Sequence, residues 1–471
     1  MNCSAQHHDY MLSNSISRRN RTWWTIFDII QGTGFIEASP IFTSYYPAYL
    51  RSGQYPLTLF CLISTFICYF ITAIYIVRGI GQFLKKSAGV DKKASIKAFQ
   101  VVFSEWEWSI SEECSIASQK KSFRKKIVDV VQHVQLKTMP KITFASSLIL
   151  FCKRLFITIV AMLVILFFWF CVYRVTEFQM AFEYGLSHNE STPTVNIILN
   201  WMENIFRNKY SDLTDNDYKE LSEGLCLFLV QMWVTLTVLT INNVAPSILK
   251  FLATFEYFSE TKAMRILTGR LVVLQFSSIA VLIHAQLNDP NFNQCPVQDY
   301  CWEAKLGQQI YALMMFQPML WMIYTIFSIL IRLPIRLCCC KKTKSRFLLS
   351  KLDVPGCALD ILNLQTLCWI GIVVAPILPL VTIALQMLYG ILLTIHVALF
   401  CKPSANIQNT AATKYMFVLG SGLSFFCVLI SLSLLIMFVP PSLGCSPFRG
   451  LTNCLNAVTY YVCHTSSETV K

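Results

Sequence analysis

Amide and carboxylate side chains occur inside several long apolar segments of this 471-residue chain. A polar group in hydrocarbon costs free energy unless water or a neighbouring helix satisfies it. Such residues therefore mark either a hydrated path on which ions are coordinated or hydrogen bonds between packed helices. We predict a path lined by residues from three separate apolar segments: Asn242, Asn243, Gln317, Asp360 and Asn363.

The sequence contains no motif that would make these groups an enzyme site. It lacks Gly-x-Ser-x-Gly, His-Glu-x-x-His and a complete Walker loop, and no Cys-x-x-Cys pair stands at metal-binding spacing. Gln31-Gly32-Thr33-Gly34 resembles part of a phosphate loop but lacks its lysine, so we interpret it as a turn. We predict no enzymatic activity, no cofactor and no metal site.

The elements that must position the polar residues are membrane-spanning helices. Hydrophobic residues make up 55% of the chain and charged residues 14%, which leaves too little polar surface for a soluble globule. A helix needs about 20 apolar residues to cross the hydrocarbon core of a bilayer. We predict an all-α polytopic membrane protein with eight transmembrane helices: Pro56–Val77, Leu148–Tyr173, Leu225–Leu249, Ile266–Ala285, Ile310–Leu333, Leu359–Val381, Ile383–Phe400 and Tyr415–Val439.

Charge alternates between the connections that join these spans. Short cytoplasmic connections retain Lys and Arg, so the basic connections are predicted to lie inside and the acidic ones outside. The predicted organisation is an extracellular N-terminal segment (1–55), a first span (56–83), a basic cytoplasmic loop (84–147), a second span (148–177), an extracellular loop (178–223), a six-span bundle with short loops (224–440) and an extracellular C-terminal tail (441–471).

Three glycosylation sequons fall on the predicted outer side, at Asn2, Asn20 and Asn189. They support the predicted topology. We predict a glycoprotein of the plasma membrane.

The long cytoplasmic loop combines tryptophan with a basic, helically spaced run at Trp106, Trp108, Lys120, Lys121 and Arg124. A basic amphipathic helix binds anionic lipid or the groove of a calcium-sensor protein. The alternative interpretation is a solvated inner face that only sets the topology.

Cys301-Trp302-Glu303 with Gly307-Gln308 resembles the signature of the transmembrane channel-like family. Further stretches resemble family landmarks in the same order: Gly32-Thr33-Gly34, Glu256 with Gly269-Arg270, Trp369-Ile370-Gly371, Pro376 to Pro379, and Pro447-Phe448-Arg449-Gly450. The resemblance covers most of the chain from about Gln31 onward. From the sequence alone, Arg270 is predicted to snorkel at the start of its span, with a role in conduction as the alternative.

The resemblance implies a bundle like that of the anoctamins and osmosensitive channels, in which ten spans form a groove-like ion path through spans four to seven. The eight predicted spans correspond to family spans two to nine, so the chain is expected to lack the first and tenth. Family members pair largely through the tenth span, which places a homodimer of this chain in question. Asn243 falls where the family usually has Met, Gln317 where it commonly has Asp, and Asp353 at the acidic start of span seven.

By this resemblance we expect a mechanically gated ion channel subunit that lets cations permeate. The alternative is a non-conducting regulatory subunit that binds a calcium- and integrin-binding protein through the cytoplasmic loop, and lipid scrambling is a third function that the anoctamin likeness suggests. Membrane lipids are expected partners, and nucleic acid is not.

Overall fold

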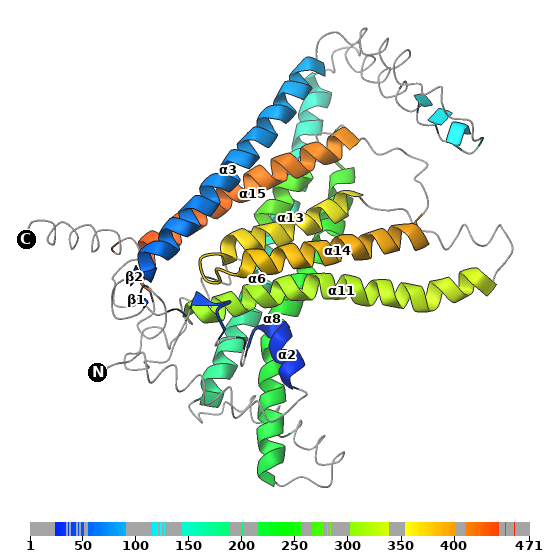
Figure 1. The fold of residues 1–471 in the computed structure, drawn as a ribbon. Helices are drawn as coiled ribbons and strands as arrows, with labels where there is room; N and C mark the ends of the chain where they lie inside the picture. Colours follow the sequence, from blue (N-terminus) through cyan, green and yellow to red (C-terminus); the bar gives the residue numbers. More distant parts are fainter. Residues whose placement is uncertain are drawn as a thin grey trace, which may run out of the picture.

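The computed structural model describes residues 24–33, 39–43, 49–50, 55–90, 144–187, 215–256, 266–274, 302–338, 354–401 and 410–441, with short pieces and single residues elsewhere. Two very short antiparallel strands, β1 (Tyr49–Leu50) and β2 (Tyr55–Pro56), pair just before the first long helix. The helices with their bounds are α2 (Trp24–Gln31), α3 (Leu57–Val90), α6 (Phe144–Ser187), α8 (Asp215–Thr254), α11 (Trp302–Cys338), α13 (Val354–Gly371), α14 (Leu378–Phe400) and α15 (Thr410–Phe438) (Figure 1).

Six of the described helices are long and apolar enough to cross a membrane. This confirms the predicted all-α polytopic class, while the count of eight spans stays a prediction. The span predicted at Ile266–Ala285 is described as helical over 266–274 and at isolated later positions. The six candidate spans are Leu59–Gln82, Leu148–Phe182, Phe228–Thr254, Trp302–Arg332, Leu378–Phe400 and Phe417–Phe438.

The division between α13 and α14 lies earlier than the sequence predicted. The predicted boundary beside Thr382 is wrong, because α13 ends at Gly371 and α14 begins at Leu378. Pro379 stands in the first turn of α14, where a residue without an N–H leaves no intrahelical hydrogen bond unmade. The polar residues before the division thus belong to α13, a helix of 18 residues, and the apolar residues after it form the separate span of α14.

Neighbouring helices follow one another across the molecule in the order α11, α14, α13, α15 and α3 (Figure 1). α6 packs along α8, and α8 contacts α11. Only 6% of the span in α3 is buried, against 41% of the span in α8. α3 therefore forms an edge whose large side chains, such as Phe60, Phe66 and Phe70, face outward as a lipid-facing helix requires.

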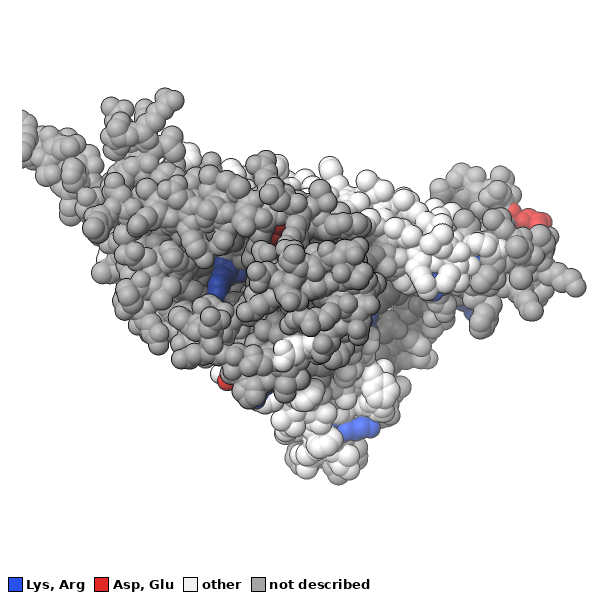
Figure 2. Space-filling model, turned by 90° about the horizontal axis from the view of Figure 1, so that it is seen from below, with Lys and Arg blue, Asp and Glu red and all other residues white. Residues whose placement is uncertain are grey.

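Charged side chains are sparse on the described surface. Figure 2, which looks at the molecule from below, shows the described Lys, Arg, Asp and Glu as a few small groups that are separate from one another. This distribution fits helices whose outer faces meet lipid, since a charge in hydrocarbon is costly.

The N-terminal helix α2 docks on the start of α11. Gly32 ends α2 with φ +75°, the left-handed conformation that glycine adopts after a helix, which confirms the turn. A Cβ at Gly32 would lie 2.9 Å from Tyr311 Cδ1, and one at Gly307 would lie 2.9 Å from Phe42 Cδ1. The Tyr311 hydroxyl also donates to the carbonyl of Ile29 at 3.0 Å. Two stretches that carry the family resemblance therefore pack against each other.

Candidate functional site

A cavity of about 520 Å³ lies among α8, α11, α13 and α14. Its wall contains all five polar residues that the sequence singled out in the apolar segments: Asn242, Asn243, Gln317, Asp360 and Asn363. Asp353, predicted for the same path, lies outside the described residues. The structure thus brings these five residues to one cavity.

Hydrogen bonds join α11, α13 and α14 around the carboxylate of Asp360. Its Oδ1 accepts from Gln317 Nε2 at 3.4 Å, and its Oδ2 accepts from Trp321 Nε1 at 3.3 Å and from the Tyr389 hydroxyl at 3.1 Å. The Nδ2 of Asn363 donates to Gln317 Oε1 at 3.0 Å. Donors on separate helices therefore fix this carboxylate in one orientation.

Aromatic rings form the part of the wall next to this network. The Trp321 ring meets those of Tyr324, Tyr389 and His396 edge-on, with centroids 5.8, 5.5 and 6.0 Å apart. His396 is 4% exposed, and its Nδ1 is buried without a hydrogen-bond partner. Edge-to-face packing stabilises the positions of these rings.

The α8 wall contains a proline and a lysine. α8 continues through Pro246, which cannot donate to the carbonyl of Asn242 one turn before it. The Nδ2 of Asn243 donates to the Leu239 carbonyl at 2.9 Å. This donor therefore does not replace the hydrogen bond that the Asn242 carbonyl lacks because of Pro246. Lys250, one turn beyond Pro246, is half-buried and lines the cavity.

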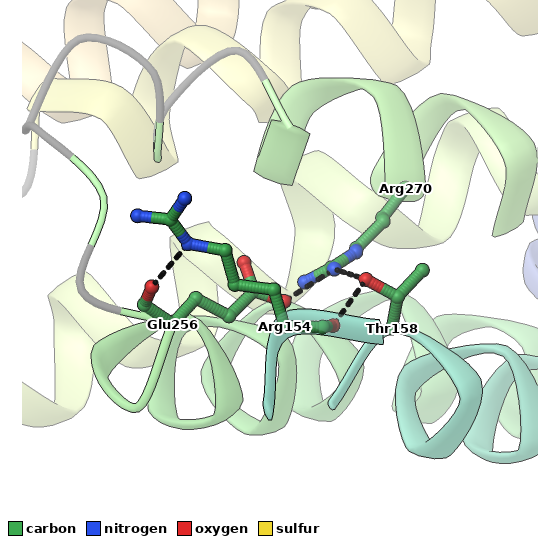
Figure 3. A network of polar contacts seen from close by, with 4 residues as sticks. All are labelled: Arg154, Thr158, Glu256 and Arg270. Atoms are coloured by element: carbon green, nitrogen blue, oxygen red, sulfur yellow. Dashed lines mark hydrogen bonds and ion pairs between the residues drawn. The ribbon is translucent and has the colours of Figure 1, made fainter. Parts of the chain in front are cut away.

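A buried ion pair lies beyond the end of α8 (Figure 3). Glu256 Oε1 is 2.5 Å from Arg270 Nη2, and the two side chains are 0% and 7% exposed. The same Nη2 donates to Thr158 Oγ1 on α6 at 3.2 Å, and Arg154 Nε donates to the Glu256 main-chain carbonyl at 3.1 Å. The prediction that Arg270 snorkels is therefore wrong, because its guanidinium turns inward to a carboxylate.

The signature stretch at the start of α11 does not line the cavity. Trp302 and Glu303 are 4% and 7% exposed, and Gly307 packs on Phe42 as described above. Gln308 is half-buried, with its Nε2 lacking a partner. Cys301 lies outside the described residues. The described part of this stretch is a packing element that holds α2 and α11 together.

The remaining predicted sites fall mostly outside the described residues. Asn2, Asn20, Asn189, Trp106, Trp108 and Lys121 all do. Lys120 and Arg124 are described as exposed helical residues, and a spacing of four puts them on one helix face.

Sequence reasoning missed the aromatic wall and Lys250. Trp321 on α11 and His396 on α14, which line the cavity, are ordinary residues of apolar helices, as is Tyr389, which packs behind them on Trp321. A lysine at the end of a span is typical of a topology signal. The spacing of Tyr389 and His396, two helical turns apart on α14, was the one available sign that these rings share a face.

Comparisons with known proteins agree with the sequence landmarks. Residues 301–411 match the TMC domain. The chain is 22% identical over 447 residues to the Mus musculus protein "Voltage-gated chloride channel TMC4". The aligned region covers 90% of the chain and 58% of that protein. The Homo sapiens protein of the same name is 22% identical over 448 residues, covering 90% of the chain and 56% of that protein.

A second relative, "Transmembrane channel-like protein 5" of Homo sapiens, is 26% identical over 226 residues, which is 47% of the chain and 22% of that protein. The chain spans somewhat more than half the length of its two TMC4 relatives. The domain match over residues 301–411, joined to similarity along most of the chain, supports membership of the TMC family of transmembrane channel-like proteins.

Proposed function

We propose that this chain is an ion channel subunit of the plasma membrane and that ions pass through the cavity among α8, α11, α13 and α14. The observation that carries the proposal is the convergence of amide and carboxylate groups from three helices on one space of about 520 Å³. Water in such a cavity removes the cost of polar groups at membrane depth. Relatives whose names describe channels support the same function.

Opening by membrane tension is the finer part of this proposal. α8 has Pro246 in the cavity wall, and a missing main-chain hydrogen bond makes this the position where α8 bends most easily. A bend there changes the width of the cavity that Asn242, Asn243 and Lys250 line. Cation permeation is the accompanying expectation, because Asp360 supplies a carboxylate to the path.

A voltage-gated chloride conductance is the second candidate, since that is the activity named for the mouse and human TMC4 relatives. Among the described residues, the cavity wall contains one lysine and one aspartate, so both signs of charge face the space. Recordings at fixed tension with Na⁺ replaced by a large organic cation, and then Cl⁻ replaced by gluconate, separate the two candidates. The reversal potential moves with whichever ion carries the current.

A non-conducting regulatory subunit is the alternative in the interaction class. Exposed Lys120 and Arg124 on one helix face support binding of an acidic partner such as a calcium- and integrin-binding protein. The test is a pull-down with that protein, comparing the parent chain with Lys120→Glu/Arg124→Glu. Equal capture by both chains would count against this role.

The conduction proposal is tested by recording from the full chain in liposome patches under suction and under voltage steps. Asn363→Leu removes an amide from the cavity wall and is expected to lower single-channel conductance several-fold. The matched control is Gln365→Leu on the same helix, which removes a bond of the same kind and length, Gln386 Nε2 to Gln365 Oε1 at 3.0 Å, away from the cavity. Folded protein without current under either stimulus, or equal losses in both variants, would refute conduction through this cavity.

A further inference from the structure

A separate, smaller cavity lies between α3, α15 and the turn that joins α13 to α14. We call it the α3 crevice; it has a volume of about 150 Å³ and is lined mainly by residues within 61–69, 372–376 and 429–436. α3 and α15 pack against each other (Figure 1). Phe66 and Ser433 are exposed at the rim, whereas Leu432 and Phe448 are only 6% and 8% exposed. The crevice therefore leads from the outer surface of two candidate spans to buried apolar side chains.

The hydroxyl groups that line the α3 crevice have no proton left to donate. All five donate to main-chain carbonyls: Thr43 to Val374 at 3.0 Å, Ser64 and Thr65 to Cys61 at 3.0 and 2.7 Å, Ser433 to Leu429 at 2.7 Å, and Tyr69 to Trp369. The other lining residues are apolar side chains and one cysteine. A buried water needs two to four polar partners. Hydrocarbon therefore suits this crevice better than water does.

The hydrocarbon that meets this surface is lipid. Only 6% of the span in α3 is buried, so its outer face is a lipid-facing surface, and that surface continues through the rim into the crevice. We infer that the α3 crevice binds the end of an acyl chain of a membrane phospholipid. An apolar cavity of this size holds a benzene ring, so about six chain carbons fit in it. The inference does not depend on the proposed conduction.

An acyl chain in the crevice is connected to a helix of the larger cavity. Tyr69 lines the crevice from α3, and its hydroxyl donates to the Trp369 carbonyl near the end of α13. α13 also carries Asp360 and Asn363, which line the candidate ion path. Lipid bound in the crevice therefore contacts the side chain that ties α3 to α13, and it lies outside the ion path itself.

The test is photolabelling of the full chain in phosphatidylcholine liposomes that contain a phosphatidylcholine with a diazirine at the end of one acyl chain. Irradiation is expected to label the turn at residues 372–376, which lines the crevice. It is also expected to label Phe60, which is 71% exposed on α3 outside the crevice and serves as the internal reference for surrounding lipid. Ser64→Phe and Ser433→Phe each place a ring at the rim, and each is expected to lower labelling of the turn several-fold relative to Phe60.

Thr72→Phe is the matched control, because the Thr72 hydroxyl also donates within α3, to the Cys68 carbonyl at 2.7 Å, but does not line the crevice. This variant is expected to keep the parent labelling of the turn, and the unfolding midpoint of each variant checks that it is folded. A parent chain labelled at Phe60 but not at the turn would overturn the inference. So would labelling of the turn that neither rim variant lowers, or an equal loss in Thr72→Phe.

A sterol that carries the same diazirine is the competing probe. Labelling of the turn by the sterol and not by the acyl chain would overturn the assignment to phospholipid. Since photolabelling requires no current, its result stands apart from the recordings that test conduction. A chain that is labelled at the turn but carries no current would refute the proposed function and leave the acyl-chain site in place.

Discussion

Removing the carboxylate of Glu256 is expected to destabilise the protein more than any other single isosteric change in the described part of the chain. Glu256 is 0% exposed at its side chain, and Arg270, its partner at 2.5 Å, is 7% exposed. Glu256→Gln keeps the shape of the side chain but leaves a buried guanidinium without its counter-charge. Breaking a buried pair in this way typically costs about 3–5 kcal/mol, because one charge stays desolvated and uncompensated.

The reciprocal variant and the double variant turn this estimate into a thermodynamic cycle. Arg270→Met leaves the buried carboxylate alone and is expected to cost about as much, again about 3–5 kcal/mol. Glu256→Gln/Arg270→Met removes both charges, so its cost is expected to fall to about 2 kcal/mol or less, since replacing a buried pair by uncharged groups is often close to neutral. The coupling energy is then at least about 4 kcal/mol, well above the few tenths expected for independent sites.

The assay is equilibrium unfolding of the purified chain in detergent, followed by fluorescence for the parent, both single variants and the double variant. Glu177→Gln is the control, because Arg174 and Glu177 form an exposed ion pair at 2.8 Å on α6. Such pairs contribute about 0–1 kcal/mol, so this variant is expected to unfold close to the parent. Additive costs in the double variant would refute the buried pair as the source of the stability.

Three further changes test packing and the cavity network by the same unfolding measurement. Gly32→Ala is expected to cost about 1–2 kcal/mol, because the left-handed φ of +75° is unfavourable for any residue with a Cβ; an unchanged midpoint would contradict this left-handed conformation. Gly371→Ala places a Cβ 2.2 Å from Leu378 Cδ2 and is expected to cost about 1–3 kcal/mol, whereas Gly390→Ala, with nothing within 4 Å, is expected to be neutral or slightly stabilising. Tyr389→Phe removes one donor to the cavity carboxylate and is expected to cost about 1 kcal/mol; no loss at all would argue that water replaces the hydroxyl.

Hydropathy located the spans but not the ends of their helices. The second span was predicted to end at Tyr173, yet α6 continues to Ser187, and α8 begins at Asp215 rather than near Leu225. Apolar content measures which residues suit hydrocarbon, while a helix continues into water as long as its main-chain hydrogen bonds persist. The same measure joined α13 to the first residues of α14, although Pro376 and Pro379 indicated a break within that stretch.

Polarity within apolar segments identified the amide and carboxylate groups of the cavity wall. It could not show that α11 and α13 turn Gln317 and Asp360 toward each other, since rotation about a helix axis depends on packing with neighbours. It also assigned Arg270 to the membrane surface, because one sequence does not reveal that Glu256 lies within reach of it. Residue types and spacing thus do not show which side chains from distant parts of the chain contact one another.

The buried ion pair and the cavity are connected through shared wall elements. Lys250 lines the cavity from α8, and Glu256 follows on the same stretch of chain. Arg270, its partner, directly precedes Leu271, which lines the cavity from another side. Thr158 accepts a hydrogen bond from Arg270, so α6, whose span is only 22% buried, joins the same network. Directional contacts of this kind resist sliding more than apolar packing does, so the ion pair ties the position of α6 to the two elements that carry Lys250 and Leu271 in the cavity wall.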